Sequence, residues 1–476
     1  MAFLKKDLPK RSENLSDWYN KVVLLAELAD YGPAKGTMIY RPYGFAIWEL
    51  IQKEMDALIK EKGVSNAYFP LFIPESLLKK EEAHVEGFSP ELAVVTIGGG
   101  EELTEKLIVR PTSETIMYDA YARWIHSWRD LPLMINQWNN VVRWEKRTYM
   151  FLRTTEFLWQ EGHTVHATHE EAWNMVTWAM DMYTKVYTEL FALPGCVGKK
   201  SESEKFAGAD VTLTYETLMP EGKALQSCTS HDLGQNFSKP FEITFQNQEG
   251  KNDYGWQTSW GLSTRSIGGM IMVHGDDGGL RLPPRLAPIQ VIVLPIKAES
   301  TLIAKAEKIK DELTKHGVRV QIDASENETI GFRINTWELK GVPLRLEIGA
   351  KELAEEKVTA VRRDTGEKIA VPLDEMTTTI PKLLDAIQAN FLAEAKQFLK
   401  DNTHTASSSD ELKQIMMTSR GFISALWCEQ EMCEKKIKEE TKASTRCMPL
   451  DAPDEDGTCV GCGNPAKHRW MFGQAY

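Results

Sequence analysis

The sequence predicts an α/β protein built from several domains. Its 476 residues correspond by length to about two to four domains. After Pro288 the pattern changes to strands that alternate with helices, which favours a small α/β domain with a largely parallel sheet. Five of the seven cysteines crowd the C-terminal end, and in a reducing compartment such crowding is typical of metal binding before disulfides.

The composition excludes several classes of protein. With 42% hydrophobic and 26% charged residues, the chain has the make-up of an ordinary soluble protein. The first twenty residues are charged and lack the apolar segment of a signal peptide, and no apolar run approaches the roughly 20 residues that span a bilayer. We therefore expect a cytoplasmic protein with no membrane partner. A net charge of −12 argues against a general nucleic-acid coat protein, although local basic patches still permit RNA binding.

The first predicted elements are a helix and a strand. Apolar residues recur at helical spacing over residues 45–61, and Gly63 is a plausible stop. Residues 66–73 then have the pattern of a strand, although this stretch contains Pro70. Most helix and strand pairs of this kind are plain core, so the pair alone indicates no function.

A predicted hairpin follows, with strand-like residues 134–142, a polar turn at 146–150 and a second strand from Arg153 onward. Arg143 ends the first strand, and an arginine can hold a phosphate through two parallel hydrogen bonds. Alternate residues of the second strand share one face, and this face contains cationic, aromatic and acidic side chains. These residues are Arg153, Phe157, Trp159, Glu161 and His163. An aromatic ring on this face can cover a base, so the hairpin can hold a nucleotide.

Three further polar clusters are weak when taken singly. In Arg110–Glu114 a hydroxyl and a carboxylate stand two residues apart, but an ordinary helix N-terminus explains them equally well. The segment Gln226–His231 reads most simply as a polar loop, since Cys228 has no identifiable partner base. In Thr258–Arg265 a glycine lets the backbone approach a ligand, and the arginine follows at a strand-to-helix transition, where it can clamp a phosphate.

The remaining chain contains the α/β pattern and the cysteines. We expect strands at residues 290–294, 318–322, 344–348 and 358–361, a helix that Ser300 can cap, and a polar loop at 403–409. Two cysteine pairs well apart suit a tetrahedral zinc site that stabilises a small domain, whereas free thiols rank second and disulfides last. The expected metal ligands are Cys428, Cys433, Cys459 and Cys462. Cys447 lies in neither pair.

Taken together, the motifs are highly specific. Their order, and the segments RPTSE, FLRTTEFLWQEGH, EKFAGAD, SHDLGQNFSK and GQAY, resemble prolyl-tRNA synthetases, in particular those of the archaeal and eukaryotic type. The resemblance runs from about residue 15 to residue 476. It implies a class II catalytic domain with an antiparallel sheet at 1–283, an α/β anticodon-binding domain at 284–400 and a small α+β zinc-binding domain at 401–476.

The resemblance also implies roles for individual residues. Arg143 matches a contact to the α-phosphate and the substrate carboxylate, and Arg265 matches a contact to the γ-phosphate; both count as catalytic. The implied ATP contacts are Arg143, Glu145, Arg153, Phe157, Gln226, Thr229, Ser263 and Arg265. The implied proline contacts are Thr112, Glu114, Arg143, Trp159, Glu161, His163, Phe206 and His231. Phe88 and Glu91 match a loop over the site, and Glu338, Arg345 and Lys351 match anticodon contacts.

The implied function is ATP-dependent activation of L-proline and its transfer to the 3′ end of tRNA(Pro), with Mg²⁺ on the phosphates and a structural Zn²⁺. A homodimer is expected, because the helix and strand at 45–73 match an interface motif of this class. Two alternatives stay open. A threonyl or glycyl enzyme is the nearest, although the RPTSE segment favours proline. A synthetase-like tRNA-binding regulator is the other, although it would be expected to lose Arg143, Arg153 and Arg265, which are all present.

Overall fold

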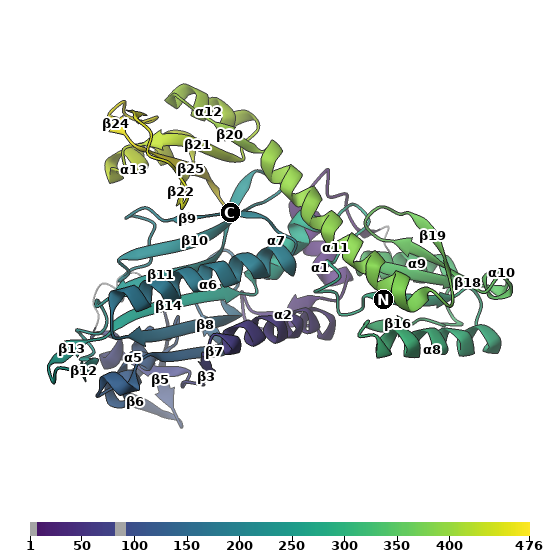
Figure 1. Cartoon of the computed structure of the whole chain (residues 1–476), viewed down its shortest axis with the longest axis horizontal. Coiled ribbons are helices and arrows are strands. Elements are labelled where there is room, and N and C mark those ends of the chain that lie inside the picture. The colour runs from purple at the N-terminus through teal and green to yellow at the C-terminus, as the bar shows by residue number, and fades with distance from the viewer. Residues whose placement is uncertain (1–6, 81–91) are drawn as a thin grey trace.

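The computed structural model describes residues 7–80 and 92–476, so Phe88 and Glu91 lie outside the described residues. Three parts of the chain can be followed in Figure 1, and we call them the large-sheet region (7–80 and 92–283), the α/β region (284–400) and the C-terminal region (401–476). Helix α11 (Met376–Asp401) crosses from the α/β region to the C-terminal region (Figure 1). At 1.5 Å per residue, its length is about 39 Å.

The N-terminal segment begins with α1 (Leu15–Leu25), the β1–β2 hairpin (Ala29–Tyr31 and Met38–Tyr40) and α2 (Pro42–Glu61). The helix predicted for residues 45–61 is confirmed, and it starts three residues earlier because proline fits the first turn of a helix. The strand predicted for residues 66–73 is wrong. Two short strands stand there instead, β3 (Ser65–Asn66) and β4 (Phe72–Pro74), in different sheets and on either side of Pro70, which has no N–H to donate.

One sheet of eleven strands dominates the molecule, and most of its neighbouring strands are antiparallel. The predicted hairpin is confirmed as β7 and β8, which pair antiparallel over their full length. In spatial order the strands are β20 (Thr403–Thr405), β21 (Phe422–Trp427), β25 (His468–Ala475), β22 (Ser444–Pro449), β9 (Gly195–Lys199), β10 (Val211–Leu218), β11 (Lys223–Gly234), β14 (Trp256–Ser263), β8 (Glu156–His166), β7 (Leu133–Val142) and β3. The predicted loop at residues 226–231 is wrong, because these residues lie within β11.

Helices cover the large sheet. The long α6 (His169–Glu189) lies across β10, β11 and β14, and it begins with a capping box between Thr168 and Glu171 (Figure 1). As expected, α7 (Arg265–His274) follows directly on β14. The smaller elements of the region are α3 (Glu75–Leu78), β5 (Ala93–Gly98), β6 (Glu101–Val109), α5 (Glu114–Trp124), η3 (Trp128–Asp130), β12 (Thr244–Gln246) and β13 (Asn252–Tyr254).

The α/β region has a mixed sheet of five strands. Its elements are β15 (Val291–Pro295), α8 (Ser300–Lys315), β16 (Val320–Ile322), α9 (Ile330–Leu339), β17 (Leu344–Ile348), α10 (Ala350–Ala354), β18 (Lys357–Arg362) and β19 (Lys368–Pro372). Strand β15 runs parallel to β16 and β17, but β18 runs antiparallel to both of its neighbours, β17 and β19. The expectation of a largely parallel sheet is therefore correct for β16, β15 and β17 and wrong for β18 and β19. The connection from β17 to β18 is too short for the crossover of a dozen or more residues that a parallel pair needs.

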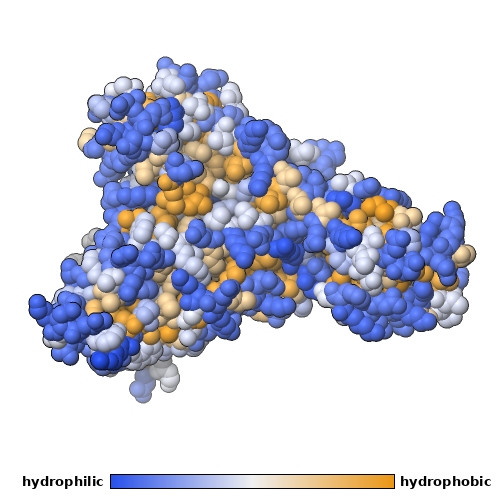
Figure 2. Space-filling view, in the orientation of Figure 1, coloured by the Kyte–Doolittle hydropathy of each residue, from blue (hydrophilic) through white to orange (hydrophobic). Residues whose placement is uncertain are grey.

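The surface reflects this arrangement. Figure 2 shows hydrophilic residues over the outward face of α8, whose apolar residues Leu302, Ala306 and Ile309 are buried. Hydrophobic residues gather on this face of the molecule where the three regions meet (Figure 2). Glu299 occupies the N-cap of α8 and Ser300 is the first helical residue, so Ser300 does not cap this helix.

The C-terminal region shares the large sheet. It contains α12 (Ser409–Thr418), α13 (Glu431–Thr441) and the short β23 (Gly457–Thr458) and β24 (Pro465–Ala466). Strand β22 pairs with β9 of the large-sheet region, and β25 pairs with β11. The polar loop predicted at 403–409 is wrong for its first three residues, which form β20 beside β21. Within residues 7–80 and 92–476, none of the helices combines the length and the apolar character needed to cross a membrane.

Candidate active site

Strand β8 supplies one face of a cavity of about 190 Å³. Its alternate residues Phe157, Trp159, Glu161 and His163 all line this cavity, as the strand periodicity predicts. Arg153 does not belong to the strand, because β8 starts at residue 156 and Arg153 lies in the preceding loop. The sequence expectation was wrong on that point.

The cavity brings together most of the expected substrate residues, from β8, β10–β11, β14 and the starts of α5 and α7. Those that line it are Thr112, Glu114, Arg143, Phe157, Trp159, Glu161, His163, Phe206, Gln226, Thr229, His231, Ser263 and Arg265. The other two, Glu145 and Arg153, line an adjoining cavity of about 160 Å³, where Arg153 Nε lies 2.7 Å from Glu145 Oε2.

The two cavities differ in charge. The smaller one is lined by three arginines, Arg143, Arg153 and Arg265, with Glu145 as its carboxylate, and two of these arginines, Arg143 and Arg265, also line the larger one. The carboxylates of Glu114 and Glu161 line only the larger cavity. The site therefore offers cationic groups to phosphates at one end and anionic groups to an ammonium at the other.

Two arginines are held by backbone carbonyls. Arg143 Nε donates to the carbonyl of Pro111 at 3.0 Å, and its guanidinium lies 5.6 Å from the ring centroid of Phe157 and 5.4 Å from that of Trp159. Arg265 Nε donates to the carbonyl of Leu152 at 3.1 Å. Arg265 Nη1 also donates to the carbonyl of Gln226 at 3.4 Å. A guanidinium has five N–H donors in a planar fork, a geometry suited to binding an anion.

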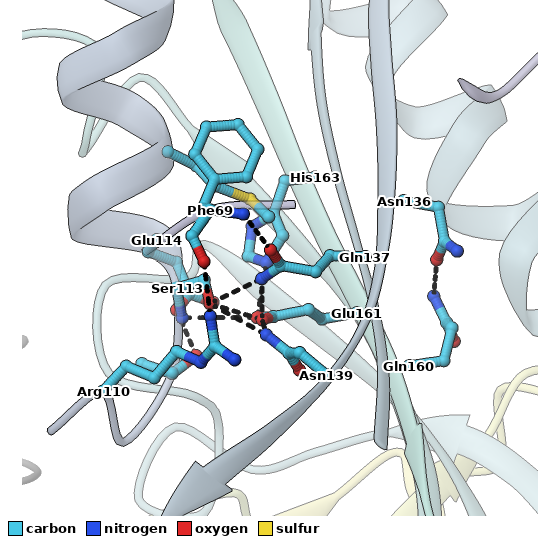
Figure 3. A network of polar contacts seen from close by, with 12 residues as sticks. Phe69, Arg110, Ser113, Glu114, Asn136, Gln137, Asn139, Gln160, Glu161 and His163 are labelled. Atoms are coloured by element: carbon cyan, nitrogen blue, oxygen red, sulfur yellow. Dashed lines mark hydrogen bonds and ion pairs between the residues drawn. The ribbon is translucent and has the colours of Figure 1, made fainter. Parts of the chain in front are cut away.

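Glu161 is the centre of the buried polar network in Figure 3. Its carboxylate accepts hydrogen bonds from Asn139 Nδ2 at 2.7 Å and Gln137 Nε2 at 3.1 Å, and from the Ser113 hydroxyl. His163 Nε2 lies 2.9 Å from its other oxygen. Glu161 is 2% exposed, and a buried carboxylate needs such partners to offset its desolvation. The network fixes Glu161 in place beneath the cavity.

The network shifts the pKa values of its members. Burial alone would raise the pKa of Glu161, but the hydrogen bond and charge of His163, with the bonds from Ser113 and Asn139, hold that pKa below its ordinary value. Burial opposes protonation of His163, yet Glu161 and Glu114 raise the pKa of this imidazole. Burial, helped by the charge of His163, lowers the pKa of His231 to about 3. His231 is therefore a neutral wall of the cavity.

Glu114 is the second carboxylate of the larger cavity, and it is the first residue of α5, where the helix dipole favours a negative charge. The Thr112 hydroxyl donates to Glu114. Ser113 occupies the N-cap position but makes no capping bond, because its hydroxyl donates to Glu161 instead. The RPTSE segment is thus a helix start whose two hydroxyls serve carboxylates of the site.

Sequence reasoning missed several residues of the site. Ser113, Gln137 and Asn139 hold Glu161, and further residues that line the cavity are Glu204, Thr212, Ser227, Cys228, Ser259, Trp260, Gly261 and Leu262. A usable signal existed for part of this set, since Gln137 and Asn139 are polar residues inside a strand predicted to be buried. Cys228 lies in the cavity wall, where burial raises the pKa of its thiol well above the ordinary value, so it is not an activated nucleophile.

The four expected cysteines come together at the end of the C-terminal region. The sulfur atoms of Cys428, Cys433, Cys459 and Cys462 all lie within 4.8 Å of one another. Each contact joins the two pairs: Cys428 to Cys462 at 3.6 Å and Cys433 to Cys459 at 3.5 Å. Four converging thiols match the donor set of a structural zinc site and leave no ligand position for substrate.

The expected anticodon residues are only partly together. Glu338 and Arg345 line a cavity of about 500 Å³ in the α/β region, and Arg345 Nη1 lies 3.2 Å from Glu338 Oε1. Arg362, Arg363 and other residues with cationic or polar groups line the same cavity. Lys351 lies on α10 and does not line it.

Family models match all three regions. The tRNA synthetase class II core domain (G, H, P, S and T) matches residues 95–274. The anticodon binding domain matches residues 290–383, and the prolyl-tRNA synthetase C-terminal domain matches residues 409–476.

Whole-chain relatives agree. A proline–tRNA ligase of Natranaerobius thermophilus is 51% identical over 476 residues, which cover 99% of this chain and 98% of the relative. One of Clostridium novyi is 50% identical, over 98% of this chain and 97% of the relative. A crystal structure of prolyl-tRNA synthetase from Cryptosporidium parvum, complexed with halofuginone and AMPPNP, superposes with a TM-score of 0.95 at 43% identity, over 98% of this chain and 99% of that one. The chain therefore belongs to the prolyl-tRNA synthetase family.

Proposed function

We propose that this chain activates L-proline with ATP to prolyl-adenylate and transfers the prolyl group to the 3′ end of tRNA(Pro). The observation that carries the proposal is the division of charge in the site. The carboxylates of Glu114 and Glu161 line only the larger of the two cavities, Arg153 lines only the smaller one beside it, and Arg143 and Arg265 line both. An amino acid whose carboxylate meets a nucleotide triphosphate has the complementary distribution of charge.

The larger cavity suits proline. Its volume of about 190 Å³ fits a compact ring, and its walls include the rings of Trp159, Phe206 and His231. The secondary ammonium of proline would meet Glu114, whose other neighbours are the Thr112 hydroxyl and the positive end of α5. The side chain of His163 is held by Glu161, so it lines the cavity without competing for the ammonium.

The chemistry follows from positioning and charge. The carboxylate of proline attacks the α-phosphorus of ATP, and pyrophosphate leaves, so no side-chain nucleophile is required. Arg143 would neutralise the α-phosphate and orient the substrate carboxylate, while Arg265 would hold the γ-phosphate. Phe157 would stack on adenine, with Gln226, Thr229, Ser263, Glu145 and Arg153 as further contacts to ATP. Mg²⁺ bound to the phosphates supplies additional charge neutralisation.

The remaining roles are part of the same proposal. Domains at residues 1–283, 284–400 and 401–476 would serve catalysis, anticodon binding and zinc binding. Glu338 and Arg345 would contact the anticodon from the cavity in the α/β region, and Lys351 would do so from outside it. A structural Zn²⁺ would be held by Cys428, Cys433, Cys459 and Cys462, whose thiols converge.

We also propose a two-fold homodimer that works in the cytoplasm. Its support within the chain is a group of large apolar side chains that are exposed on β1, β2 and the start of α2, namely Tyr31, Ile39 and Phe45. Large apolar side chains exposed in one segment of a chain favour burial against a second copy.

The test is amino-acid-dependent exchange of pyrophosphate into ATP, measured with each amino acid in turn. Exchange that depends on proline supports the proposal, and aminoacylation of tRNA(Pro) then tests the second step. Exchange with threonine or glycine in place of proline would favour the nearest alternative. A folded chain that binds tRNA(Pro) but exchanges with no amino acid would be a regulator without ligation activity.

A further inference from the structure

The loop between β9 and β10, residues 200–210, forms one wall of the larger cavity. Glu204 and Phe206 of this loop line the cavity. The Phe206 ring lies against His231, with centroids 4.6 Å apart, and the Phe206 backbone N–H donates to Thr212 Oγ1 at 3.0 Å. The position of this loop therefore sets the shape of the cavity on the side of Phe206.

The opposite side of the same loop contacts the C-terminal region. Glu434 of α13 accepts hydrogen bonds from the hydroxyls of Ser201, at 3.3 Å, and of Ser203. Thr445 of β22 donates to the same carboxylate, and its hydroxyl lies 3.1 Å from that of Ser201. One helix turn further along α13, Lys438 Nζ lies 3.6 Å from Glu204 Oε1.

The contact at Glu434 is deeply buried except at Ser203, which is exposed. Glu434 is 4% exposed, Ser201 3% and Thr445 fully covered. A carboxylate in such a place needs its hydrogen bonds, because an unpaired buried charge is costly. The buried hydroxyls of Ser201 and Thr445 are therefore held in a fixed geometry around Glu434.

The loop itself transmits this geometry to the cavity. The backbone N–H groups of Glu204 and Lys205 both donate to the carbonyl of Ser201, at 3.1 Å and 2.9 Å. Residues 201–205 thus form one closed turn, and Phe206 follows it directly. A shift of Ser201 or Ser203 therefore shifts Phe206 as well.

Buried ion pairs between side chains also join the start of this loop and β10 to the C-terminal region. Lys200 Nζ lies 2.9 Å from Glu216 Oε1, and Arg446 Nη2 lies 2.8 Å from Glu216 Oε2. Arg446 belongs to β22 of the C-terminal region and Glu216 to β10 of the large sheet. The start of the loop is consequently anchored independently of Glu434, so removal of Glu434 should loosen the turn without detaching the two regions.

We propose that Glu434 is a positioning residue of the amino-acid pocket: through Ser201 and Ser203 it holds the turn that places Phe206 against the substrate. This inference rests on the proposed function, because it assigns proline to the cavity that Phe206 lines. It gives the C-terminal region a direct part in recognition of the amino acid. Arg153 lines only the adjoining smaller cavity of the two, which Phe206 does not line, whereas Arg143 and Arg265 line both.

The experiment compares variants in pyrophosphate exchange, with KM measured separately for proline and for ATP. Glu434→Ala should raise the KM for proline about tenfold, since small displacements of positioning groups have effects of this order, and it should leave the KM for ATP within about twofold. Glu434→Gln keeps an oxygen that accepts from the hydroxyls and should restore most of the affinity for proline. Glu439→Ala is the matched control, because Glu439 lies exposed on the same helix.

A double-mutant cycle tests the route through the loop. Ser203→Ala should raise the KM for proline in the same direction, and the double variant with Glu434→Ala should be no worse than Glu434→Ala alone, because both changes break one contact. Additive effects would show that Ser203 and Glu434 act separately and would overturn the proposal. Ser203→Ala removes one hydroxyl from the loop, so it keeps the test decisive if Glu434→Ala fails to fold.

Other results also contradict the inference. Equal increases in the KM for proline and for ATP, or a fall in kcat with an unchanged KM for proline, would indicate a general structural role. An increase in the KM for proline in Glu439→Ala as large as that in Glu434→Ala would also indicate a general structural role. Failure of the proposed function is distinguishable, because the unaltered chain would then show no exchange with proline at all.

Discussion

The sulfur atom of Cys447 lies 3.5 Å from that of Cys196, across the junction where β22 pairs with β9. Cys447 is fully buried there and lies outside the group of four cysteines at the end of the chain. The odd cysteine of the sequence therefore belongs to the packing between two regions. This placement agrees with the expectation that Cys447 is not a metal ligand. Substitution of Cys447 can therefore be compared with substitution of one of the four expected ligands.

Zinc content should separate the two kinds of cysteine. Cys459→Ser removes one of four converging thiols, so it should lose bound zinc and lower the unfolding temperature of the C-terminal region. Cys447→Ser should keep the zinc content of the unaltered chain, as measured by atomic absorption on dialysed protein. Equal loss of zinc from both variants would mean that the ligands are wrongly assigned.

Arg143→Ala should abolish most of the activation step while the protein stays folded. The guanidinium lines both cavities and would face the charge that develops on the α-phosphate, so its removal should slow proline-dependent exchange by about 100- to 1,000-fold. The control is Arg123→Ala, because Arg123 is exposed on α5 and pairs with Asp119 away from both cavities. Near-normal exchange by a folded Arg143→Ala protein is the result that would refute this role.

Stability should fall steeply between about pH 6.5 and pH 4. Burial lowers the pKa of His166 and of His274 to about 4, and that of His231 to about 3, from an ordinary value of 6.5. In this window the unfolded chain binds these protons and the folded chain does not, so unfolding gains up to three protons. The free energy of unfolding should then drop by about 4 kcal/mol per pH unit at the steepest point.

The sign of this effect can be checked by substitution. His166→Gln should remove about one third of the dependence, seen as a smaller difference between the urea midpoints at pH 7.5 and pH 5.5. His163 has the opposite shift: its pKa is raised, so its contribution to stability is present below pH 6.5 and is lost as the pH rises through its folded value. An unchanged pH dependence in His166→Gln would show that this histidine titrates normally in the folded protein.

The chain should sediment with twice the mass of one chain at micromolar concentration. Ile39 is 50% exposed on β2 and lies among the apolar side chains assigned to the interface. Ile39→Asp places a charge there and should shift the equilibrium to monomers, whereas Ile97→Asp, on β5 and also exposed, is a control for a charge added elsewhere. A monomer at micromolar concentration in the unaltered chain would contradict the dimer.

Alanine should be activated weakly, and the chain should not correct the error. A pocket that admits proline cannot exclude a smaller amino acid by size, and each lost methylene-sized contact costs only about 1–3 kcal/mol. Residues 153–265 form β8 to β14, the helix α6 and the β12–β13 hairpin, which leaves no room there for a separate editing domain. Purified enzyme should therefore leave preformed alanyl-tRNA(Pro) intact without ATP; hydrolysis in proportion to enzyme concentration would reveal an editing site.

Local sequence patterns correctly predicted features that depend on the periodicity of a single helix or strand. The alternation along β8 put Phe157, Trp159, Glu161 and His163 on one face, because side chains of a strand alternate whatever surrounds them. The apolar spacing of α2 predicted that helix correctly. The strand predicted after α2 was wrong because Pro70, which cannot donate a backbone hydrogen bond, stands between two short strands of different sheets. The order of all the motifs together predicted residues that line one cavity, which the single clusters could not do.

Local sequence patterns could not predict hydrogen bonds between residues that are distant in sequence. The hydroxyl of Ser113 suits an N-cap, but it bonds Glu161, which comes from another strand. Likewise, nothing near Glu434 in sequence points to Ser201 or Ser203. Such contacts depend on how strands are ordered in the sheet, and that order is set by pairings such as that of Lys223 with Gln474.

The pairing of β25 with β11, β21 and β22 also has a consequence for the order in which the protein can be made. A ribosome releases residues 223–234 long before residues 468–475, so β11 must wait for its last neighbour until residue 475 has left the exit tunnel. Contacts so distant in sequence close large loops late and slow folding. During translation the half-finished sheet exposes the edges of β9 and of the end of β11, where chaperones would find an unpaired strand to protect.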